Sequence, residues 1–385
     1  MLIAEVGLVE VEKVALFLLV LSVLIVLHEL GHFVLARRNG VRVNEFAVGM
    51  GPKLLGWTSP RTNTLYSLRA LPIGGYCAMQ GEDGKTSEAE QQREFLAAET
   101  GGPARDSENF QAKSAWSRLA IVLAGPVANF LLCYAILLIA ALAFGVPSPN
   151  RTQPVVGTVV AGSPGEIAGI RAGDRILSLD GAPVTGAQLV DRIHGSLGKR
   201  LDIVYERDGA RTEIYVTPEA CSKFIVGTKS AEKMGCIGFT PVPAYERIGV
   251  VQAVRESGAE FANIADQTVG SIGMLVMHFT QYAPQVSGVI GMGQAATTIE
   301  DFGWGPYLSL AALISFALGL FNLLPIPALD GGRAAFIVAE IVRGKPIDPE
   351  KEAMVHVAGF AALMALMLLV AFHDIARIFS RNGVM

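Results

Sequence analysis

Four long apolar stretches divide the chain of 385 residues. They are Val14–Ala36, Leu119–Val146, Phe302–Leu329 and Ala353–Phe372. Each is about as long as the roughly 20 apolar residues that a helix needs to cross a bilayer. The second and third carry no charged residue; prolines interrupt both, which a membrane tolerates where neighbouring protein satisfies the backbone. The pattern predicts a polytopic α-helical membrane protein with four transmembrane helices.

Between the first two stretches, apolar and polar residues alternate instead. Val41–Val43 and Leu65–Arg69 have the period of two that is typical of strands, and pairs such as Gly51-Pro52 and Gly74-Gly75 separate them. We interpret this region as β-hairpins that lie at the membrane or re-enter it. A small cytoplasmic sheet is the alternative.

A compact α+β domain is predicted between the second and third stretches, over residues 151–217. Its expected elements are a strand at Val155–Val160, a turn and short helix at Ser163–Ile170, a helix at Gln188–Leu197, and strands at Arg200–Arg207 and Arg211–Val216. Asp208-Gly209 between the last two strands is a strong hairpin signal. A further helical stretch is expected at Tyr245–Gln281.

These patterns divide the chain into eight predicted units. They are a first transmembrane helix (1–40), a membrane-reentrant β-loop (41–80), a flexible cytoplasmic segment (81–115), a second transmembrane helix (116–146), an extracytoplasmic domain with an extension (147–244), a helical segment (245–301), a third transmembrane helix (302–342), and a fourth transmembrane helix with the C-terminus (343–385).

The distribution of lysine and arginine predicts the orientation. Basic residues are concentrated between the first and second stretches and between the third and fourth, so the segments Arg37–Arg118 and Arg333–Lys351 are expected to be cytoplasmic. Both termini and residues 147–301 are then extracytoplasmic. The composition indicates that the lipid bilayer is a partner of the chain, because 51% of residues are hydrophobic and only 17% are charged. A net charge of −4 predicts no nucleic-acid partner.

The first apolar stretch contains the segment Leu27–His32, which reads H-E-x-x-H. Residues four apart share one face of a helix, so His28 and His32 can bind one metal ion together. Glu29 lies about 100° around the helix from His28, within reach of a water molecule at that metal. A charged Glu in an apolar helix is costly, which favours a functional role. The pattern predicts a catalytic zinc site.

Catalytic zinc sites use three protein ligands and an open position. Asp330, at the end of the third stretch, is the candidate for the third ligand, because an aspartate there is costly unless it is paired, exposed or bound to metal. An interfacial Asp near Arg333 is the alternative. His28 lies about 13 Å from the cytoplasmic end of its helix at 1.5 Å per residue. Asp330 closes the third stretch, which also ends on the cytoplasmic side, so both residues are expected in the cytoplasmic part of the bilayer.

Together these residues resemble the site-2 protease family of intramembrane zinc metalloproteases, particularly its bacterial regulator-of-sigma-E branch. The matching segments are His28–His32, Gly125–Asn129 and Asn322–Gly331. Gly162–Gly181 looks like part of a PDZ domain. The resemblance covers nearly the whole chain. One departure is that this branch usually has two PDZ domains in tandem, whereas residues 151–217 leave room for one. The resemblance therefore implies the chemistry but not the identity of the substrate.

The resemblance implies His28, His32 and Asp330 as zinc ligands and Glu29 as the catalytic base. Asn322 is implied to hold the substrate backbone; Asn129 matches a second family asparagine near the active site. Either asparagine could instead support helix packing. The implied substrate-binding β-loop contributes Gly74, Gly75 and Tyr76.

The implied function is hydrolysis of peptide bonds within transmembrane segments of single-span proteins in the bacterial inner membrane. Substrates would resemble anti-sigma factors or signal-peptide remnants and would already be trimmed by another protease. One alternative is a membrane zinc peptidase of a different fold that cuts exposed tails, with a Glu as its third ligand. The other is a non-catalytic PDZ scaffold.

Four cysteines occur in the chain. Cys77 and Cys133 fall in the predicted β-loop and second span. Cys221 and Cys236 fall in the extracytoplasmic region and flank a polar segment, and an oxidising compartment permits a bridge there. We therefore predict a Cys221–Cys236 disulfide with no catalytic part. Two unpaired thiols are the alternative.

Overall fold

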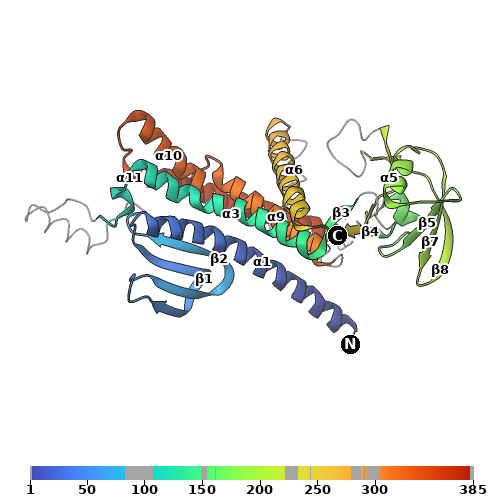
Figure 1. Ribbon diagram of the computed structural model, residues 1–385, viewed down its shortest axis with the longest axis horizontal. Helices are drawn as coiled ribbons and strands as arrows, with labels where there is room; N and C mark the ends of the chain where they lie inside the picture. The colour runs from blue at the N-terminus through green and yellow to red at the C-terminus, as the bar shows by residue number, and fades with distance from the viewer. Residues whose placement is uncertain are drawn as a thin grey trace, which may run out of the picture.

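The computed structural model describes residues 2–82, 107–148, 154–160, 162–221, 233–242, 244–278, 288, 292–293, 296 and 303–381. The long helices form an elongated bundle, with a sheet along one side and a β-rich domain at one end (Figure 1). We use "β-rich domain" for the described residues between 154 and 242.

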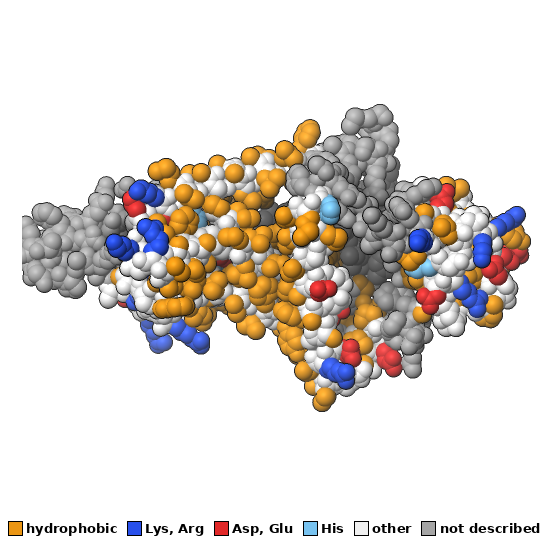
Figure 2. All heavy atoms as spheres, turned by 90° about the horizontal axis from the view of Figure 1, so that it is seen from above, with side chains coloured by type: hydrophobic (Ala, Val, Ile, Leu, Met, Phe, Trp, Pro, Cys, Tyr) orange, Lys and Arg blue, Asp and Glu red, His pale blue; other side chains and the backbone are white. Residues whose placement is uncertain are grey.

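Four helices are long and apolar enough to cross a membrane among the described residues. They lie in α1 (Leu2–Arg38), α3 (Ala115–Phe144), α9 (Trp304–Leu323) and α11 (Pro349–Arg381). Hydrophobic side chains cover much of the bundle surface, whereas the β-rich domain carries charges of both signs (Figure 2). The prediction of four apolar helices of spanning length is confirmed.

The third predicted span is wrong at its C-terminal end. Helix α9 ends at Leu323, a turn follows, and a separate helix, α10 (Asp330–Arg343), begins at Asp330. Two prolines explain the break. Pro325 and Pro327 lack an N–H group and disfavour helical backbone in the residue before them, and Leu324 is indeed extended.

Helix α3 packs between α1 and α9, and small residues allow the close approach. A Cβ added to Gly31 of α1 would lie 2.4 Å from the carbonyl oxygen of Ala124 in α3. On the opposite side, Ser315 of α9 donates a hydrogen bond to the backbone oxygen of Asn129 at 2.9 Å. Helix α6 (Val250–Met277) lies against α3, near the end that carries the β-rich domain (Figure 1).

The β-loop region forms one sheet from two long, bent strands, β1 (Val43–Thr58) and β2 (Leu65–Met79). The first half of β1 pairs with both halves of β2, so that Val48 faces both Gly75 and Leu68. The second half of β1 pairs with Leu65–Arg69. Segment 75–79 is therefore one edge of this sheet, and it lies beside α1 (Figure 1).

The end of the predicted flexible segment is ordered, contrary to the expectation for residues 81–115. The 3₁₀ helix η1 (Phe110–Ala112) is anchored by Phe110, which is 1% exposed and donates its N–H to the oxygen of Gln80 at 2.8 Å. Burial of this aromatic side chain in the core shared by α1, β1 and α3 fixes the segment. Residues 83–106 lie outside the described residues.

The β-rich domain has a four-stranded sheet in the order β6-β5-β7-β8, covered by α5. The elements of the domain are β4 (Val156–Val159), α4 (Pro164–Ile167), β5 (Arg175–Leu179), β6 (Ala182–Pro183), α5 (Gly186–His194), β7 (Leu201–Arg207), β8 (Ala210–Val216), β9 (Glu219–Ala220), β10 (Gly235–Cys236) and β11 (Phe239–Pro241). Asp208 and Gly209 both have positive φ, as the predicted hairpin turn requires.

The domain extends beyond the predicted limit of residue 217, because β11 pairs with β4. Two short strands, β3 (Val146–Ser148) and β12 (Ala244–Glu246), pair with each other where the domain joins the bundle. Tyr245, expected in a helix, is therefore in a strand. Cys221 and Cys236 form a disulfide, whereas Cys77 and Cys133 are free and buried.

Candidate active site

Three side chains from two distant parts of the chain converge inside the bundle. His28 and His32, one turn apart on α1, are each only 5% exposed, and Asp330 is the first residue of α10. Oδ2 of Asp330 lies 3.0 Å from Nε2 of His28 and 3.3 Å from Nε2 of His32. The two Nε2 atoms are 3.2 Å apart. The structure thus brings together all three predicted ligands.

The second nitrogen of each ring determines the tautomer. Nδ1 of His32 donates to the carbonyl oxygen of Ile121 at 2.9 Å, which leaves a lone pair on Nε2. Nδ1 of His28 lies 3.1 Å from the side-chain nitrogen of Asn129, whose Oδ1 is buried without a partner. The oxygen and nitrogen of this amide can be exchanged, and Oδ1 then accepts a hydrogen bond from Nδ1–H of His28, which leaves a lone pair on Nε2. Both Nε2 lone pairs then face the carboxylate.

This arrangement suits a bound cation. Two lone pairs and a carboxylate oxygen cannot satisfy one another, and Oδ2 of Asp330 is buried without a hydrogen bond. Tetrahedral coordination at about 2.0 Å places ligand atoms roughly 3.3 Å apart, which matches the three separations in this cluster. Two imidazoles and one carboxylate are a donor set typical of catalytic zinc.

Comparison with known proteins identifies the family. The family model for peptidase family M50 matches residues 16–366. The chain belongs to peptidase family M50.

Relatives match almost the entire chain. Zinc metalloprotease RasP of Bacillus licheniformis is 33% identical, and the alignment covers 96% of this chain and 100% of the relative. Regulator of sigma-W protease RasP of Bacillus subtilis is 31% identical over 96% of this chain and 99% of the relative. Among solved structures, a PDZ domain of an SdrC-like protein from Listeria monocytogenes matches 24% of this chain and 90% of its own length, at 23% identity and a TM-score of 0.20.

This M50 peptidase is therefore a zinc metalloprotease, with zinc as its cofactor. The cluster of His28, His32 and Asp330 is the place where the described residues best fit that ion. A second group of three potential ligands lies in the β-rich domain, where two of its members are disulfide-bonded.

Gly125 of α3 creates the space for the two histidine rings. A Cβ at this position would lie 2.2 Å from Nε2 of His32 and 2.7 Å from Nε2 of His28. The sequence identified Gly125 only as part of a matching motif. Its physical role is that any side chain here would occupy the volume beside the two Nε2 atoms.

The turn before Asp330 sets the direction of its carboxylate. Ala328 has φ of 83°, an uncommon left-handed conformation for a residue other than glycine. Its N–H donates to Nδ1 of His356, on α11, at 2.9 Å. Gly332 sits so close to the turn that an added Cβ would lie 2.4 Å from the oxygen of Ile326. The site thus depends on α11 as well as on α9 and α10.

An ion pair that the sequence did not reveal lies beside the site. Arg333 of α10 donates to Glu82, and the other oxygen of Glu82 accepts the N–H of Met79 at 3.2 Å. The pair links the last residue of β2 to the helix that begins with Asp330. Glu82 was assigned to a flexible segment, and no local pattern pairs it with a residue 251 positions away.

The other predicted catalytic residue, Glu29, also lies at the cluster. It is partly buried and close enough to His28, His32 and Asp330 to interact with them electrostatically. Asn322 is at the end of α9, and its side-chain nitrogen donates to the oxygen of Leu318 at 3.0 Å.

Three of the predicted substrate-binding residues, Gly74, Gly75 and Tyr76, lie at the sheet edge beside α1. Gly74 has φ of 82°, and the next residue, Gly75, begins the edge segment. A Cβ on Gly75 would lie 2.6 Å from the oxygen of Ala47 and 3.5 Å from the side chain of Val26 in α1. Tyr76 follows on this edge.

A polar network centred on Glu45 ties this edge to the rest of the sheet. Glu45 accepts hydrogen bonds from Ser67 at 2.5 Å, Arg69 at 2.7 Å and Tyr76 at 2.8 Å. Arg69 also donates to the oxygen of Gly51 at 2.8 Å. Burial acts to raise the pKa of Glu45, but the three hydrogen bonds outweigh it and hold the pKa below its ordinary value.

Proposed function

We propose that this M50 peptidase hydrolyses peptide bonds within the transmembrane segments of single-span membrane proteins. His28, His32 and Asp330 hold the zinc ion, and Glu29 is the catalytic base. The observation that carries the proposal is that both histidines lie within the apolar segment Glu12–Arg38, which is long enough to cross a bilayer, while their Nε2 atoms converge on Asp330.

The chemistry follows from the donor set. Zinc, when bound, lowers the pKa of a coordinated water and polarises the scissile carbonyl. Glu29 removes a proton from the attacking water and transfers it to the leaving amine. Asn129 and the backbone of Ile121 hold the His28 and His32 rings with their Nε2 atoms toward the site.

The sheet edge beginning at Gly75 presents the substrate. A peptide bond in a helix is protected by the hydrogen bonding of the helix, so the substrate must unwind before cleavage. An extended segment can add to a sheet edge through main-chain hydrogen bonds. The edge segment 75–79 lies beside α1, which carries the histidines. In this proposal Asn322, at the end of α9, makes a further contact with the backbone of the substrate.

Topology and substrate class complete the proposal. The protein resides in the bacterial inner membrane, with the segments Arg37–Arg118 and Arg333–Lys351 cytoplasmic and both termini extracytoplasmic. The β-rich domain is an extracytoplasmic PDZ domain that binds or sizes substrates already trimmed by another protease. A relative named regulator of sigma-W protease supports a substrate that controls a sigma factor, such as an anti-sigma factor; remnants of signal peptides are a second class.

The alternatives from the sequence are not favoured. A non-catalytic scaffold disagrees with membership of a peptidase family. A peptidase of another fold would place a Glu from a later helix beside the histidines, whereas the residue beside them is Asp330.

The experiment is cleavage of single-span model substrates in liposomes by the wild type and by Glu29→Gln. We expect Glu29→Gln to lose cleavage and retain zinc, because Glu29 moves protons and binds no metal. Glu12→Gln, which changes an exposed Glu on the same helix, should behave like the wild type. Cleavage of soluble peptides but not of membrane-embedded substrates would contradict the proposal.

The ligand assignment has its own test. His28→Ala, His32→Ala and Asp330→Ala should each reduce bound zinc and abolish cleavage, since each removes one of three ligands. Normal zinc content and activity in Asp330→Ala would remove Asp330 from the metal site.

A further inference from the structure

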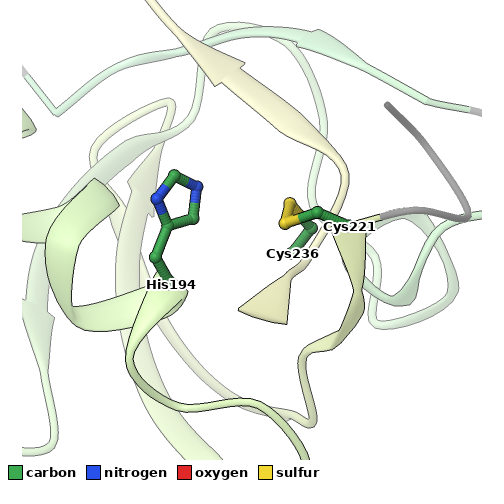
Figure 3. A group of neighbouring side chains, drawn as sticks. All are labelled: His194, Cys221 and Cys236. Carbon is green, nitrogen blue, oxygen red and sulfur yellow. A yellow bond between two sulfur atoms is a disulfide. The ribbon is translucent and has the colours of Figure 1, made fainter. Parts of the chain in front are cut away.

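A second group of metal-ligating side chains lies in the β-rich domain, at the opposite end of the molecule from the sheet β1–β2 (Figure 1). Figure 3 shows His194, at the end of α5, beside the disulfide Cys221–Cys236. The two sulfur atoms and a ring nitrogen of His194 all lie within 4.8 Å of one another. Cys221 is fully buried.

We propose that this disulfide is the oxidised form of a second metal site. After reduction, the thiolates of Cys221 and Cys236 and the imidazole of His194 bind a divalent cation of the zinc class. Its donor set of two sulfurs and one nitrogen differs from that of the catalytic cluster, and the proposal does not depend on proteolysis.

The backbone holds the two cysteines together independently of the bond between their sulfurs. Strands β9 and β10 pair in antiparallel register, and the N–H of Cys221 donates to the oxygen of Met234 at 3.0 Å. The Cα atoms of Cys221 and Cys236 are 4.9 Å apart. Reduction of the disulfide therefore leaves these hydrogen bonds in place, and the thiols remain neighbours.

The position of His194 is fixed by tight packing of β10 against the end of α5. A Cβ on Gly235 would lie 2.7 Å from the oxygen of Ile193 and 2.9 Å from the nitrogen of Leu197. Because Gly235 directly precedes Cys236, this close approach fixes the cysteine next to the last turn of the helix.

The separations suit tetrahedral coordination. With metal–sulfur and metal–nitrogen bonds of about 2.3 and 2.0 Å, ligand atoms lie roughly 3.5–3.8 Å apart. The ring nitrogen and the two sulfur atoms already lie within 4.8 Å of one another, and reduction frees both cysteine side chains to rotate. Two thiolates also neutralise a divalent cation, so a buried site carries no net charge.

An external dithiol supplies the two electrons that reduce the disulfide. Thiol–disulfide exchange breaks the Cys221–Cys236 bond, forms two cysteine thiols and oxidises the dithiol to its own disulfide. Binding of the cation then releases the two thiol protons to solvent. The reverse exchange, with the oxidised dithiol as the electron acceptor, re-forms the Cys221–Cys236 bond and releases the metal.

The test uses the full chain in detergent under anaerobic conditions, with and without a phosphine reductant. Bound zinc should rise on reduction from about one to about two ions per chain, because a second complete donor set becomes available. Cobalt added to the reduced protein should give the near-ultraviolet absorption of a cobalt–thiolate bond, which the catalytic donors cannot produce.

His194→Ala should weaken the second site, and Cys221→Ser should abolish the cobalt–thiolate band, while both retain zinc at the catalytic cluster. Arg192→Ala, on the same helix turn, is the matched control and should behave like the wild type. Thiol labelling counts the free cysteines in every sample. Two additional thiols on reduction, beyond Cys77 and Cys133, without a second zinc ion would overturn the proposal, and so would a disulfide that resists reduction in the folded protein.

Discussion

The N–H of Ala328 donates a hydrogen bond to Nδ1 of His356 at 2.9 Å, so the fourth apolar helix holds the turn that precedes Asp330. The left-handed backbone of Ala328 costs on the order of 1 kcal/mol or more and persists only where its surroundings enforce it. Packing of Gly359 against Pro327 adds a second contact between the same elements. We infer that His356 is a positioning residue for Asp330.

Replacing His356 separates this role from general stability. His356→Ala removes the acceptor for the N–H of Ala328, so the turn relaxes and Asp330 loses its direction; zinc affinity should fall about 10- to 100-fold. His356→Asn places an oxygen near the position of Nδ1 and should restore most of the affinity. Competition with a chromogenic chelator measures both variants. Equal affinities in both variants and the wild type would show that this contact does not position Asp330.

Asn129 offers a test of the histidine tautomer. Asn129→Ala removes the acceptor for Nδ1–H of His28, and zinc binding should weaken by about one to two orders of magnitude. Asn129→Asp retains an acceptor and should bind zinc nearly as well as the wild type. The measurement is zinc retention during dialysis against graded chelator. If Asn129→Asp proves as weak as Asn129→Ala, the amide must donate rather than accept.

Proline at the sheet edge should affect substrate handling more than metal binding. Gly75→Pro or Tyr76→Pro removes a backbone donor from the edge segment. We expect cleavage of helical membrane substrates to fall at least about tenfold, while zinc content stays normal. Gly56→Pro, on the opposite edge of the same sheet, is the control and should cleave normally. Equal cleavage by the two sets of variants would show that this edge does not present the substrate.

The Glu45 network predicts a pH dependence of stability. The folded-state pKa of Glu45 is depressed, so its contribution to stability is fully present above its unfolded pKa of about 4.3 and is lost as pH falls through the lower, folded-state pKa. Glu45→Gln cannot ionise and lacks this contribution. Thermal unfolding in detergent should show the largest difference between the two proteins at neutral pH, narrowing below about pH 4. A difference that is constant with pH would assign the effect to packing alone.

Local sequence patterns predicted the site residues that can be recognised within a single segment of the chain. The helical spacing of His28 and His32 is sufficient to place both on one face, and the isolated charge of Asp330 marks it in the sequence. Local patterns did not predict the contacts that orient these residues. The family resemblance indicated Asn129 but not its partner, and nothing indicated His356, because both contacts join different helices. The contact between Asn129 and His28 spans 101 positions, and no periodicity encodes it. The prolines at 325 and 327 were visible in the sequence, but their consequence, a new helix that starts at Asp330, was not.

Gly125 gives the site a requirement that a list of ligands would omit. It supplies no donor atom, yet even the single methyl group of alanine would lie 2.2 Å from Nε2 of His32. A random mutagenesis screen for lost proteolysis should therefore recover nearly every substitution of Gly125, including alanine, as often as it recovers changes of the histidines. Such a screen would score position 125 as essential, although glycine has no side chain and only leaves room for the two histidine rings.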